Sequence, residues 1–328
     1  MALLNVRNVS RHYTLRSGFW DRVVRRRPPA VLKAVDDVSF EVAPGEVLGI
    51  VGESGSGKTT TCLMVADLVS PTSGSIVFDG TDVTRREAAL RRRFRSKVQI
   101  VFQDPYESLN PRMRVVDLVA EGPRALKLWP EEETRRRAMA MLERVGLHPA
   151  AYCDRFPHQM SGGERQRVGI ASALVMEPKL VIADEPLSML DVSIRAGIVD
   201  LLARLSEQIG FSAIYVSHDL SVLSQIADRL MVMYLGQVVE IGPTREVVTA
   251  PRHHYTRALI EAVPVPDPSW RRRPSRLRDA IAEPVGASDA CRFAPRCPAA
   301  TDLCRTQRAG ETSSSAGHRF HCHHPVSQ

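Results

Sequence analysis

A run of eight residues, from Gly52 to Thr59, has the residue types and spacing that bind nucleotide phosphates. It reads Gly-Glu-Ser-Gly-Ser-Gly-Lys-Thr, follows an apolar strand-like stretch at 46–51 and precedes a helix-like run at 60–69. The glycines let successive backbone N–H groups turn towards phosphate oxygens, and the following helix N-terminus adds partial positive charge. Lys58 would reach the β- and γ-phosphates, while the Thr59 hydroxyl would bind Mg²⁺. A plain turn between strand and helix is the alternative, which the complete pattern and its correct flanks disfavour.

Two carboxylates that could act on the same nucleotide follow a second apolar stretch. Residues 180–183 are apolar, and Asp184 and Glu185 come directly after them. The C-terminal ends of parallel strands are where such a sheet places its ligand groups. Asp184 would hold Mg²⁺ through water, and Glu185 would act as general base on the attacking water. Such a pair alone is as often a solvated turn, but together with a phosphate-binding loop it indicates catalysis.

A second phosphate-facing surface is indicated at Ser161-Gly162-Gly163-Glu164. Ser161 and Glu164 have the spacing of a capping box, which predicts a helix from here to Met176. Capping does not explain the two glycines, which would expose N–H groups to an anion at the helix N-terminus.

The elements that must position these groups alternate between strands and helices. A helix is predicted at 131–145, between Pro130 and Gly146. Strands are predicted at 3–13, 35–42, 46–51, 75–78, 98–102, 179–183 and 212–216, and a hairpin at 230–234 and 237–241. The alternation predicts an α/β fold whose mostly parallel sheet is covered on both faces. The expected division is a nucleotide-binding core at 1–103 and 179–250, a helical subdomain at 104–178 and a C-terminal extension at 251–328.

Composition limits the classes of protein that fit. The 328 residues are 44% hydrophobic and 25% charged, which is ordinary for a soluble globular chain of about two domains. Neither a secretory leader nor an apolar run of about 18 residues is seen, so a membrane role would work through partner chains. The net charge is +7, and the arginine clusters at 25–27, 91–93, 135–137 and 271–273 are scattered. This scatter favours solvated faces and membrane proximity over a nucleic-acid footprint.

The stretch Met160–Arg167 resembles the signature motif of ATP-binding-cassette (ABC) ATPases, and the resemblance extends over nearly the whole chain. It implies a P-loop NTPase fold with antiparallel N-terminal strands, a helical subdomain and a small cysteine-rich C-terminal extension. It also implies that two cassettes dimerise head to tail, so that the signature closes on ATP held by the opposite subunit. The opposite-subunit contacts would be Ser161, Gly162, Gly163 and Glu164.

The same resemblance implies a role for each motif residue. Tyr13 would stack on adenine, Gln103 would sense Mg²⁺ and couple to membrane subunits, and His218 would contact the γ-phosphate as a catalytic residue beside Glu185. Asp191 would belong to the D-loop, where Leu187 and Met189 depart from the residues common in the family. Mg²⁺ would be held by Thr59, Gln103 and Asp184. The remaining ATP contacts would be Gly52, Glu53, Ser54, Gly55, Ser56, Gly57, Lys58, Thr59 and Thr60.

The C-terminal part narrows the resemblance to oligopeptide/dipeptide permease ATPases. The stretches 103–112 and 254–259 resemble that group, as do four cysteines spaced C-x5-C-x6-C-x17-C. Some members bind a 4Fe–4S cluster through such cysteines, and four thiolates suit either that cluster or zinc. The C-x2-C knuckle common at zinc sites is absent, and the nearby histidines 321, 323 and 324 could compete as ligands. Cluster, zinc and free thiols therefore stay open for Cys291, Cys297, Cys304 and Cys322.

The function implied is that of an ATP-hydrolysing importer subunit at the cytoplasmic face of the cell membrane. Its partners would be two transmembrane permease subunits, a second ABC ATPase chain of the same or a sister kind, and an extracytoplasmic solute-binding protein, with no direct nucleic-acid contact. Peptides are the substrate expected, with oligosaccharides or nickel as alternatives. A non-transport ABC ATPase acting on nucleic acid or ribosomes is less compatible, because about a hundred residues separate Lys58 from Ser161 and no internal repeat is visible. A P-loop kinase or GTPase would leave Ser161–Glu164 without a purpose.

Overall fold

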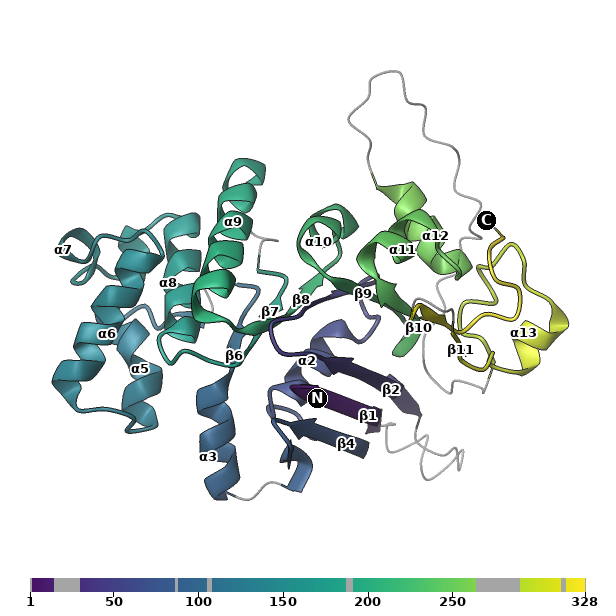
Figure 1. The fold of residues 1–328 in the computed structure, drawn as a ribbon, viewed down its shortest axis with the longest axis horizontal. Coiled ribbons are helices and arrows are strands. Elements are labelled where there is room, and N and C mark those ends of the chain that lie inside the picture. Colours follow the sequence, from purple (N-terminus) through teal and green to yellow (C-terminus); the bar gives the residue numbers. More distant parts are fainter. Residues whose placement is uncertain are drawn as a thin grey trace, which may run out of the picture. The chain divides into compact units, whose positions relative to one another are not determined.

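The computed structural model describes residues 2–14, 30–85, 88–104, 108–186, 191–263, 290–313 and 317–327 (Figure 1). The chain divides into two compact units. The helical unit comprises Met1–Leu3, Val42–Val47 and Arg85–Ser217, and the phosphate-loop unit comprises Leu4–Glu41, Leu48–Thr84 and His218–Gln328. Several sequence expectations lie outside the described residues: the D-loop positions 187–190, the arginines 25–27 and 271–273, and part of the permease-like stretch at 105–107.

The helical unit contains three parallel strands in the order β8-β7-β6. These are β6 (Val98–Val101), β7 (Leu180–Asp184) and β8 (Ser212–Ser217). Every residue of the central strand β7 is buried, which explains its continuous apolar run. Helices α3 (Ala88–Lys97) and α9 (Val192–Ile209) belong to the same unit.

The helical insert between β6 and β7 is confirmed. It contains α5 (Val115–Ala125), α6 (Glu131–Arg144), α7 (Pro149–Tyr152), the short 3-10 helix η2 (Pro157–Gln159) and α8 (Gly162–Leu174). Helices α5, α6 and α8 lie side by side in Figure 1 and bury side chains such as Val119, Leu142 and Leu174 between them. Helix α6 begins after Pro130 with three glutamates in its first turn, and Gly146 follows its end in the left-handed conformation (φ 79°).

The phosphate-loop unit contains two sheets. The first is antiparallel and has the order β2-β1-β4-β5, from β1 (Leu4–Thr14), β2 (Val31–Val42), β4 (Ser73–Phe78) and β5 (Thr81–Asp82). The short helix η1 (Val83–Arg85) follows. In the second sheet β3 (Val47–Val51) runs parallel to β9 (Arg229–Tyr234). The sheet continues through the antiparallel strands β10 (Gln237–Pro243), β12 (Arg319–Phe320) and β11 (Thr312–Ser313).

Strands β9 and β10 form the hairpin that the sequence predicts. Its turn residues Leu235 and Gly236 both have positive φ (44° and 86°), as a tight two-residue hairpin turn requires. Strands β11 and β12 come from the last 20 residues of the chain, so the C-terminal region continues this sheet.

Helix α2 (Lys58–Val65), which follows the phosphate-binding loop, is shorter than the run 60–69 predicted for it. Asp67 adopts the left-handed conformation (φ 54°) just after the helix end. The N–H groups of Asp67 and Leu68 donate to the carbonyls of Met64 and Leu63 (3.1 and 2.9 Å), which is a Schellman motif. The apolar residues beyond it suggest a longer helix, but aspartate tolerates the left-handed turn that ends α2 here.

The described part of this unit also contains the helices α10 (Leu220–Ile226), α11 (Thr244–Thr249), α12 (His254–Ala262) and α13 (Asp302–Thr306). The fully buried carboxylate of Glu240 on β10 contacts the start of α12 and a histidine just before β12. It accepts hydrogen bonds from the backbone N–H groups of Arg252 and His253 (2.7 and 2.8 Å) and contacts His318 Nε2 at 2.6 Å. This carboxylate therefore holds the start of α12 and the C-terminal residues against the sheet.

Candidate functional site

The phosphate-binding loop is packed so closely that two of its glycines cannot be replaced without movement. A Cβ on Gly52 would lie 2.2 Å from the Met233 carbonyl oxygen, and one on Gly57 would lie 2.4 Å from the Ala34 carbonyl oxygen. Gly57 also has φ 96°, which side-chain-bearing residues rarely adopt. Backbone packing therefore requires glycine at both positions, whether or not a ligand is bound.

The start of α2 has the features of an anion site. Gly57 is its N-cap and provides no side-chain acceptor, and the first turn of the helix contains no acidic residue. Lys58 is buried, and its Nζ donates to the carbonyl oxygens of Gly52 and Glu53 (2.7 and 2.9 Å), so the ammonium lies over the loop. A helix N-terminus without a side-chain cap, beside a buried cation, fits the phosphates of a nucleotide.

In the helical unit the two predicted carboxylates lie at the end of β7. Asp184 is the last residue of the strand and is 6% exposed. Glu185 has φ 46°, a conformation that costs a non-glycine residue about 1–2 kcal/mol. Its N–H donates to the Val216 carbonyl (3.0 Å) and fixes this turn against β8, while its carboxylate accepts a hydrogen bond from Gln103 Nε2 (3.2 Å). The structure therefore brings together Gln103 and Glu185, which are 82 residues apart in the chain.

The signature segment forms the capping box that the sequence predicts. Ser161 Oγ accepts from the Glu164 N–H (3.4 Å), and the Glu164 carboxylate accepts from the N–H and Oγ of Ser161 (2.7 and 2.8 Å). The Tyr152 hydroxyl donates to the second carboxylate oxygen (2.6 Å) and, with the bonds from Ser161, lowers the pKa of Glu164. Ser161 itself is exposed. A Cβ on Gly163 would lie 3.0 Å from Ile194 Cγ2 at the start of α9, so this glycine also allows close packing just after Asp191.

Tyr13 and His218 belong to the phosphate-loop unit. Tyr13 lies near the end of β1, and the guanidinium of Arg11 sits 4.4 Å from the centre of its ring. His218 is exposed directly after β8, and the next residue, Asp219, caps α10 by accepting from the Ser221 N–H (2.9 Å). The phosphate-binding loop lies in the same unit, whereas Gln103, Asp184, Glu185, the signature and Asp191 lie in the helical unit.

The four C-terminal cysteines lie in the phosphate-loop unit, and none of them is in a disulfide bond. Burial raises the pKa of Cys291, Cys297 and Cys322, the last to about 11, and the neighbouring cysteines add to each of these shifts. The Cys291 N–H donates to the Cys304 carbonyl (3.0 Å). In the described part of the chain, however, His, Cys, Asp and Glu side chains nowhere form a group of three or more that could hold a metal ion. The arrangement thus gives no support to the cluster or zinc that the spacing suggests.

The sequence interpretation missed the partners of Glu53, which it treated only as a loop residue. The Glu53 carboxylate binds Arg296, and the Glu53 N–H donates to the Tyr255 hydroxyl. The only signal for Arg296 is a basic residue within the cysteine-rich stretch, between Cys291 and Cys304.

Comparison with known proteins agrees with this geometry. Residues 35–188 match the model of the ABC transporter family, and residues 239–304 match that of the oligopeptide/dipeptide transporter C-terminal region. The chain is 43% identical to the oligopeptide transport ATP-binding protein OppF of Salmonella typhimurium, over 93% of this chain and 91% of that protein. It is 40% identical to the oligopeptide transport ATP-binding protein AppF of Bacillus subtilis, over 98% and 97%. Among solved structures it resembles the dimeric ATP-binding cassette MJ0796 bound to ADP and Pi, with a TM-score of 0.64, 27% identity, and coverage of 74% of this chain and 99% of that one.

The fold, the loop geometry and these matches define a class: the chain belongs to the ATP-binding subunits of ABC transporters and is an ABC-type ATPase. Within this class, its C-terminal region makes it a member of the oligopeptide/dipeptide transporter group.

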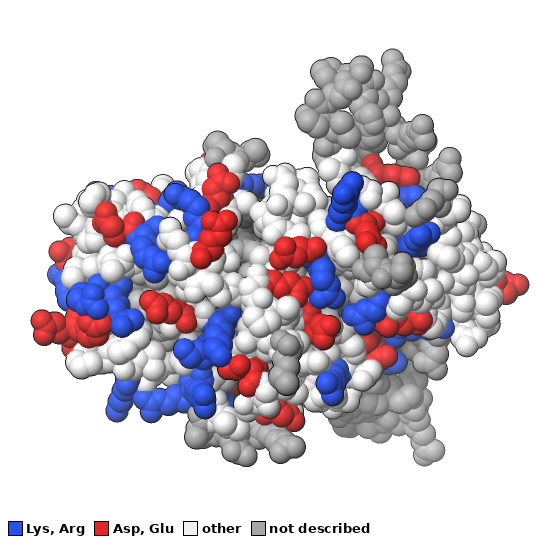
Figure 2. All heavy atoms as spheres, in the orientation of Figure 1, with Lys and Arg blue, Asp and Glu red and all other residues white. Residues whose placement is uncertain are grey.

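Two features are relevant to membrane association: the distribution of surface charge and the apolar character of the helices. Figure 2 shows acidic and basic side chains interspersed on the face that it draws, with neither sign forming a continuous surface. None of the helices in the described ranges combines the length and apolar character needed to cross a bilayer.

Proposed function

We propose that this protein is the ATP-hydrolysing subunit of a peptide importer, and that it works by closing on ATP and reorienting partner membrane subunits. Support for the peptide substrate comes from the names of its relatives OppF and AppF and from the matched C-terminal region. The subunit would bind peripherally at the cytoplasmic face of the membrane, with two transmembrane permease subunits, a second ATPase chain and an extracytoplasmic binding protein as partners.

The proposed roles follow the chemistry of each residue. Lys58 and the loop N–H groups hold the phosphates, and Tyr13 stacks on the adenine. Thr59, Gln103 and Asp184 hold Mg²⁺, which when bound neutralises charge on the β- and γ-phosphates. The remaining loop residues, Gly52 to Gly57, and Thr60 complete the ATP contacts.

Hydrolysis in this proposal depends on Glu185 as general base, with His218 contacting the γ-phosphate. The observation that carries this assignment is the hydrogen bond from Gln103 to the Glu185 carboxylate (3.2 Å), on a residue held at φ 46°. Strained backbone of this kind gathers at catalytic positions, because only the surrounding structure can maintain it. The signature residues Ser161, which is exposed, Gly162, Gly163 and Glu164, with the D-loop residue Asp191, would contact ATP held by the second chain.

The base assignment is tested by Glu185→Gln, which keeps the shape of the side chain and its contact with Gln103 but removes its basicity. We expect steady-state ATP hydrolysis to fall by about 10²-fold or more, while an ATP-bound dimer accumulates on size-exclusion chromatography. Glu177→Gln is the matched control, because Glu177 is exposed in the same unit and has nearly the same backbone conformation (φ 49°). Unchanged hydrolysis in Glu185→Gln would refute the assignment.

The substrate is tested in the assembled membrane complex, reconstituted in lipid with its binding protein. Stimulation of ATP hydrolysis when the binding protein carries short peptides would support the proposal. Stimulation by oligosaccharides or by nickel alone would retain the ATPase role and overturn the peptide substrate. A chain that hydrolyses ATP in response to nucleic acid or ribosomes, and not to any binding protein, would overturn transport itself.

A metal at the four C-terminal cysteines is not part of this proposal, because the described residues do not form a metal-binding group. The iron–sulfur and zinc alternatives rest on the cysteine spacing. Iron, sulfide and zinc analysis of anaerobically purified protein, with its absorbance near 400 nm, distinguishes cluster, zinc and free thiols.

A further inference from the structure

The second residue of the phosphate-binding loop, Glu53, is held by two side chains from the C-terminal part of the chain. The Tyr255 hydroxyl accepts a hydrogen bond from the Glu53 backbone N–H (2.9 Å). The guanidinium of Arg296 binds both carboxylate oxygens of Glu53, at 2.7 and 3.1 Å. A bidentate arginine–carboxylate pair fixes orientation as well as distance. The backbone and the side chain of the same loop residue are therefore both anchored.

The two anchors are themselves held by one aromatic cluster. Tyr255 and Phe293 are fully buried, with ring centroids 5.5 Å apart, and Tyr234 lies 4.6 Å from the first ring and 5.3 Å from the second. Arg296 comes one turn after Phe293, and its N–H donates to the Phe293 carbonyl (3.0 Å). Arg296 also donates to the Tyr234 hydroxyl (3.4 Å). Packing of Phe293 thus fixes the position from which Arg296 reaches the loop.

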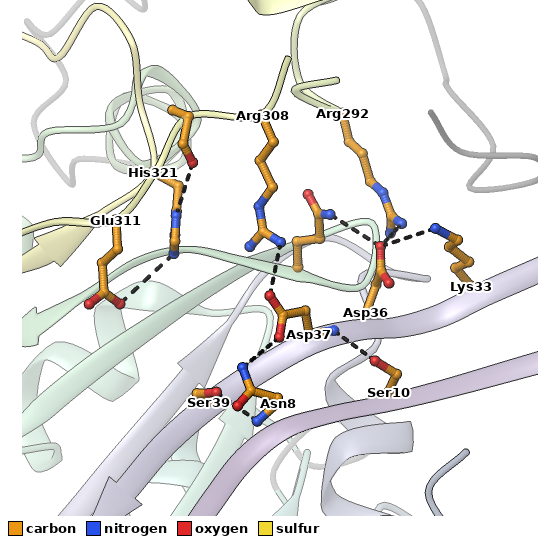
Figure 3. A network of polar contacts seen from close by, with 12 residues as sticks. Asn8, Ser10, Lys33, Asp36, Asp37, Ser39, Arg292, Arg308, Glu311 and His321 are labelled. Atoms are coloured by element: carbon orange, nitrogen blue, oxygen red, sulfur yellow. Dashed lines mark hydrogen bonds and ion pairs between the residues drawn. The ribbon is translucent and has the colours of Figure 1, made fainter. Parts of the chain in front are cut away.

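A second arginine of the same stretch, Arg292, binds Asp36 on strand β2 (Figure 3). Arg292 is almost fully buried and donates to the Asp36 carboxylate and to the Leu235 carbonyl. Burial raises the pKa of Asp36, but the charges of Arg292 and Lys33 outweigh this effect and hold the pKa below its ordinary value. Asp36 is therefore ionised near neutral pH, and its pair with Arg292 is largely shielded from water.

Backbone hydrogen bonds connect the Arg292–Asp36 pair to the phosphate-binding loop. The Asp36 N–H donates to the Gly236 carbonyl, and the Gly236 N–H donates to the Ser56 carbonyl, both at 2.8 Å. Gly57 is packed against the Ala34 carbonyl of the same strand. On the other side of Asp36, His12 Nε2 lies 3.5 Å from its carboxylate, one residue before Tyr13.

We propose that Arg296 and Tyr255 are positioning residues for the phosphate-binding loop, and that the cysteine-rich stretch containing Phe293 and Arg296 sets the affinity of this chain for ATP. The inference rests on the proposed ATP binding. A loop that is held in its binding conformation by outside contacts does not have to be ordered by the ligand, so its apparent affinity is higher. Arg296 binds the carboxylate of Glu53 and not a loop N–H group that would hold a phosphate, whereas Tyr255 accepts from the Glu53 N–H and so fixes the orientation of that peptide group.

The test measures binding of Mg²⁺-ATP to the full-length protein by isothermal titration calorimetry, together with KM and kcat of the assembled transporter. Arg296→Ala removes one hydrogen-bonded charge pair, so the loop should occupy its binding conformation less of the time. We expect this to weaken ATP binding on the order of tenfold. Arg296→Lys keeps the charge without the bidentate geometry and should fall between Arg296→Ala and the wild type. Tyr255→Phe removes only the hydroxyl, leaves the aromatic cluster packed, and should weaken binding in the same direction.

The readout that separates positioning from general stability is the split between KM and kcat. Arg296→Ala and Tyr255→Phe should raise KM for ATP more than they lower kcat. The matched control is Arg305→Ala, an exposed arginine of α13 in the same region that pairs with Asp302 (3.1 Å); it should bind ATP as the wild type does.

Folded Arg296→Ala and Tyr255→Phe variants that bind ATP within twofold of the wild type would overturn the inference. An equal loss in Arg305→Ala would also overturn it, because the effect would then be one of charge rather than of contact with the loop. Failure of the wild-type chain to bind Mg²⁺-ATP is a different result, which would refute the proposed function from which the inference starts.

Discussion

Replacing the buried carboxylate of Glu240 by an amide should loosen the C-terminal region without changing its shape. Glu240 is 0% exposed and makes three polar contacts: the N–H of Arg252, the N–H of His253, and His318 Nε2. Each oxygen of the carboxylate accepts one of the two backbone N–H groups. Glu240→Gln replaces one oxygen by an NH₂ group, which cannot accept. Whichever way the amide turns, one buried N–H loses its acceptor.

The magnitude follows from that single loss. A buried donor left without a partner costs about 1–3 kcal/mol. We therefore expect Glu240→Gln to reduce the free energy of unfolding by about 1–3 kcal/mol, measured by urea titration followed by circular dichroism. Hydrogen exchange should show faster exchange at the amides of Arg252 or His253, which reports where the loss occurs.

The matched control for this prediction is Glu246→Gln. Glu246 lies 3.7 Å from the other ring nitrogen of His318, but its side chain is 36% exposed and the N–H groups at the start of α12 donate to Glu240 instead. Because water can reach this carboxylate and replace the lost contact, Glu246→Gln should have a small effect of roughly 0–1 kcal/mol. If Glu240→Gln costs no more than Glu246→Gln, or if the amides of Arg252 and His253 keep their protection, the account of Glu240 is wrong.

Two further predictions concern the same unit. Burial, followed by the charges of His254 and His321, lowers the pKa of His253 to about 3, whereas an unfolded histidine has a pKa near 6.5. Between these two pH values the unfolded chain binds a proton that the folded chain does not. The free energy of unfolding should therefore fall as the pH is lowered from about 6.5, by up to about 1.4 kcal/mol per pH unit. His253→Asn, whose side-chain oxygen can still cap the N-terminus of α12, should flatten this slope in urea titrations at pH 7, 6 and 5, and equal slopes would contradict the assignment. Gly57→Ala should reduce the free energy of unfolding by more than about 2 kcal/mol and abolish ATP binding, because its Cβ would meet a backbone oxygen at 2.4 Å. Gly45 also has positive φ (76°) but has nothing within 4 Å of a Cβ, so Gly45→Ala should cost only about 1–2 kcal/mol in the same urea titrations, and equal costs would show that backbone strain rather than packing makes Gly57 necessary.

Much of the fold was predictable because the features concerned are local. The capping box of Ser161 and Glu164 and the turn at Leu235-Gly236 are short-range devices, so the residue types alone predict where an element begins or reverses. The limit of local prediction is visible at Asp67, where a left-handed turn ends α2 although apolar residues continue beyond it. Nothing in the residue types distinguishes an aspartate that ends a helix from one that continues it.

The candidate site likewise has parts that local sequence predicts and parts that it does not. The sequence by itself determined the phosphate-binding loop, the signature and the carboxylates after β7, because contiguous residues carry that chemistry whatever surrounds them. Only the tertiary structure decided that Gln103 meets Glu185, that Arg296 meets Glu53 across 243 residues of sequence, and that the four cysteines are not arranged as a metal site among the described residues. Those contacts depend on which strands and turns the topology places side by side, and side-chain partners so far apart in the chain leave no periodic or local pattern from which they could be predicted.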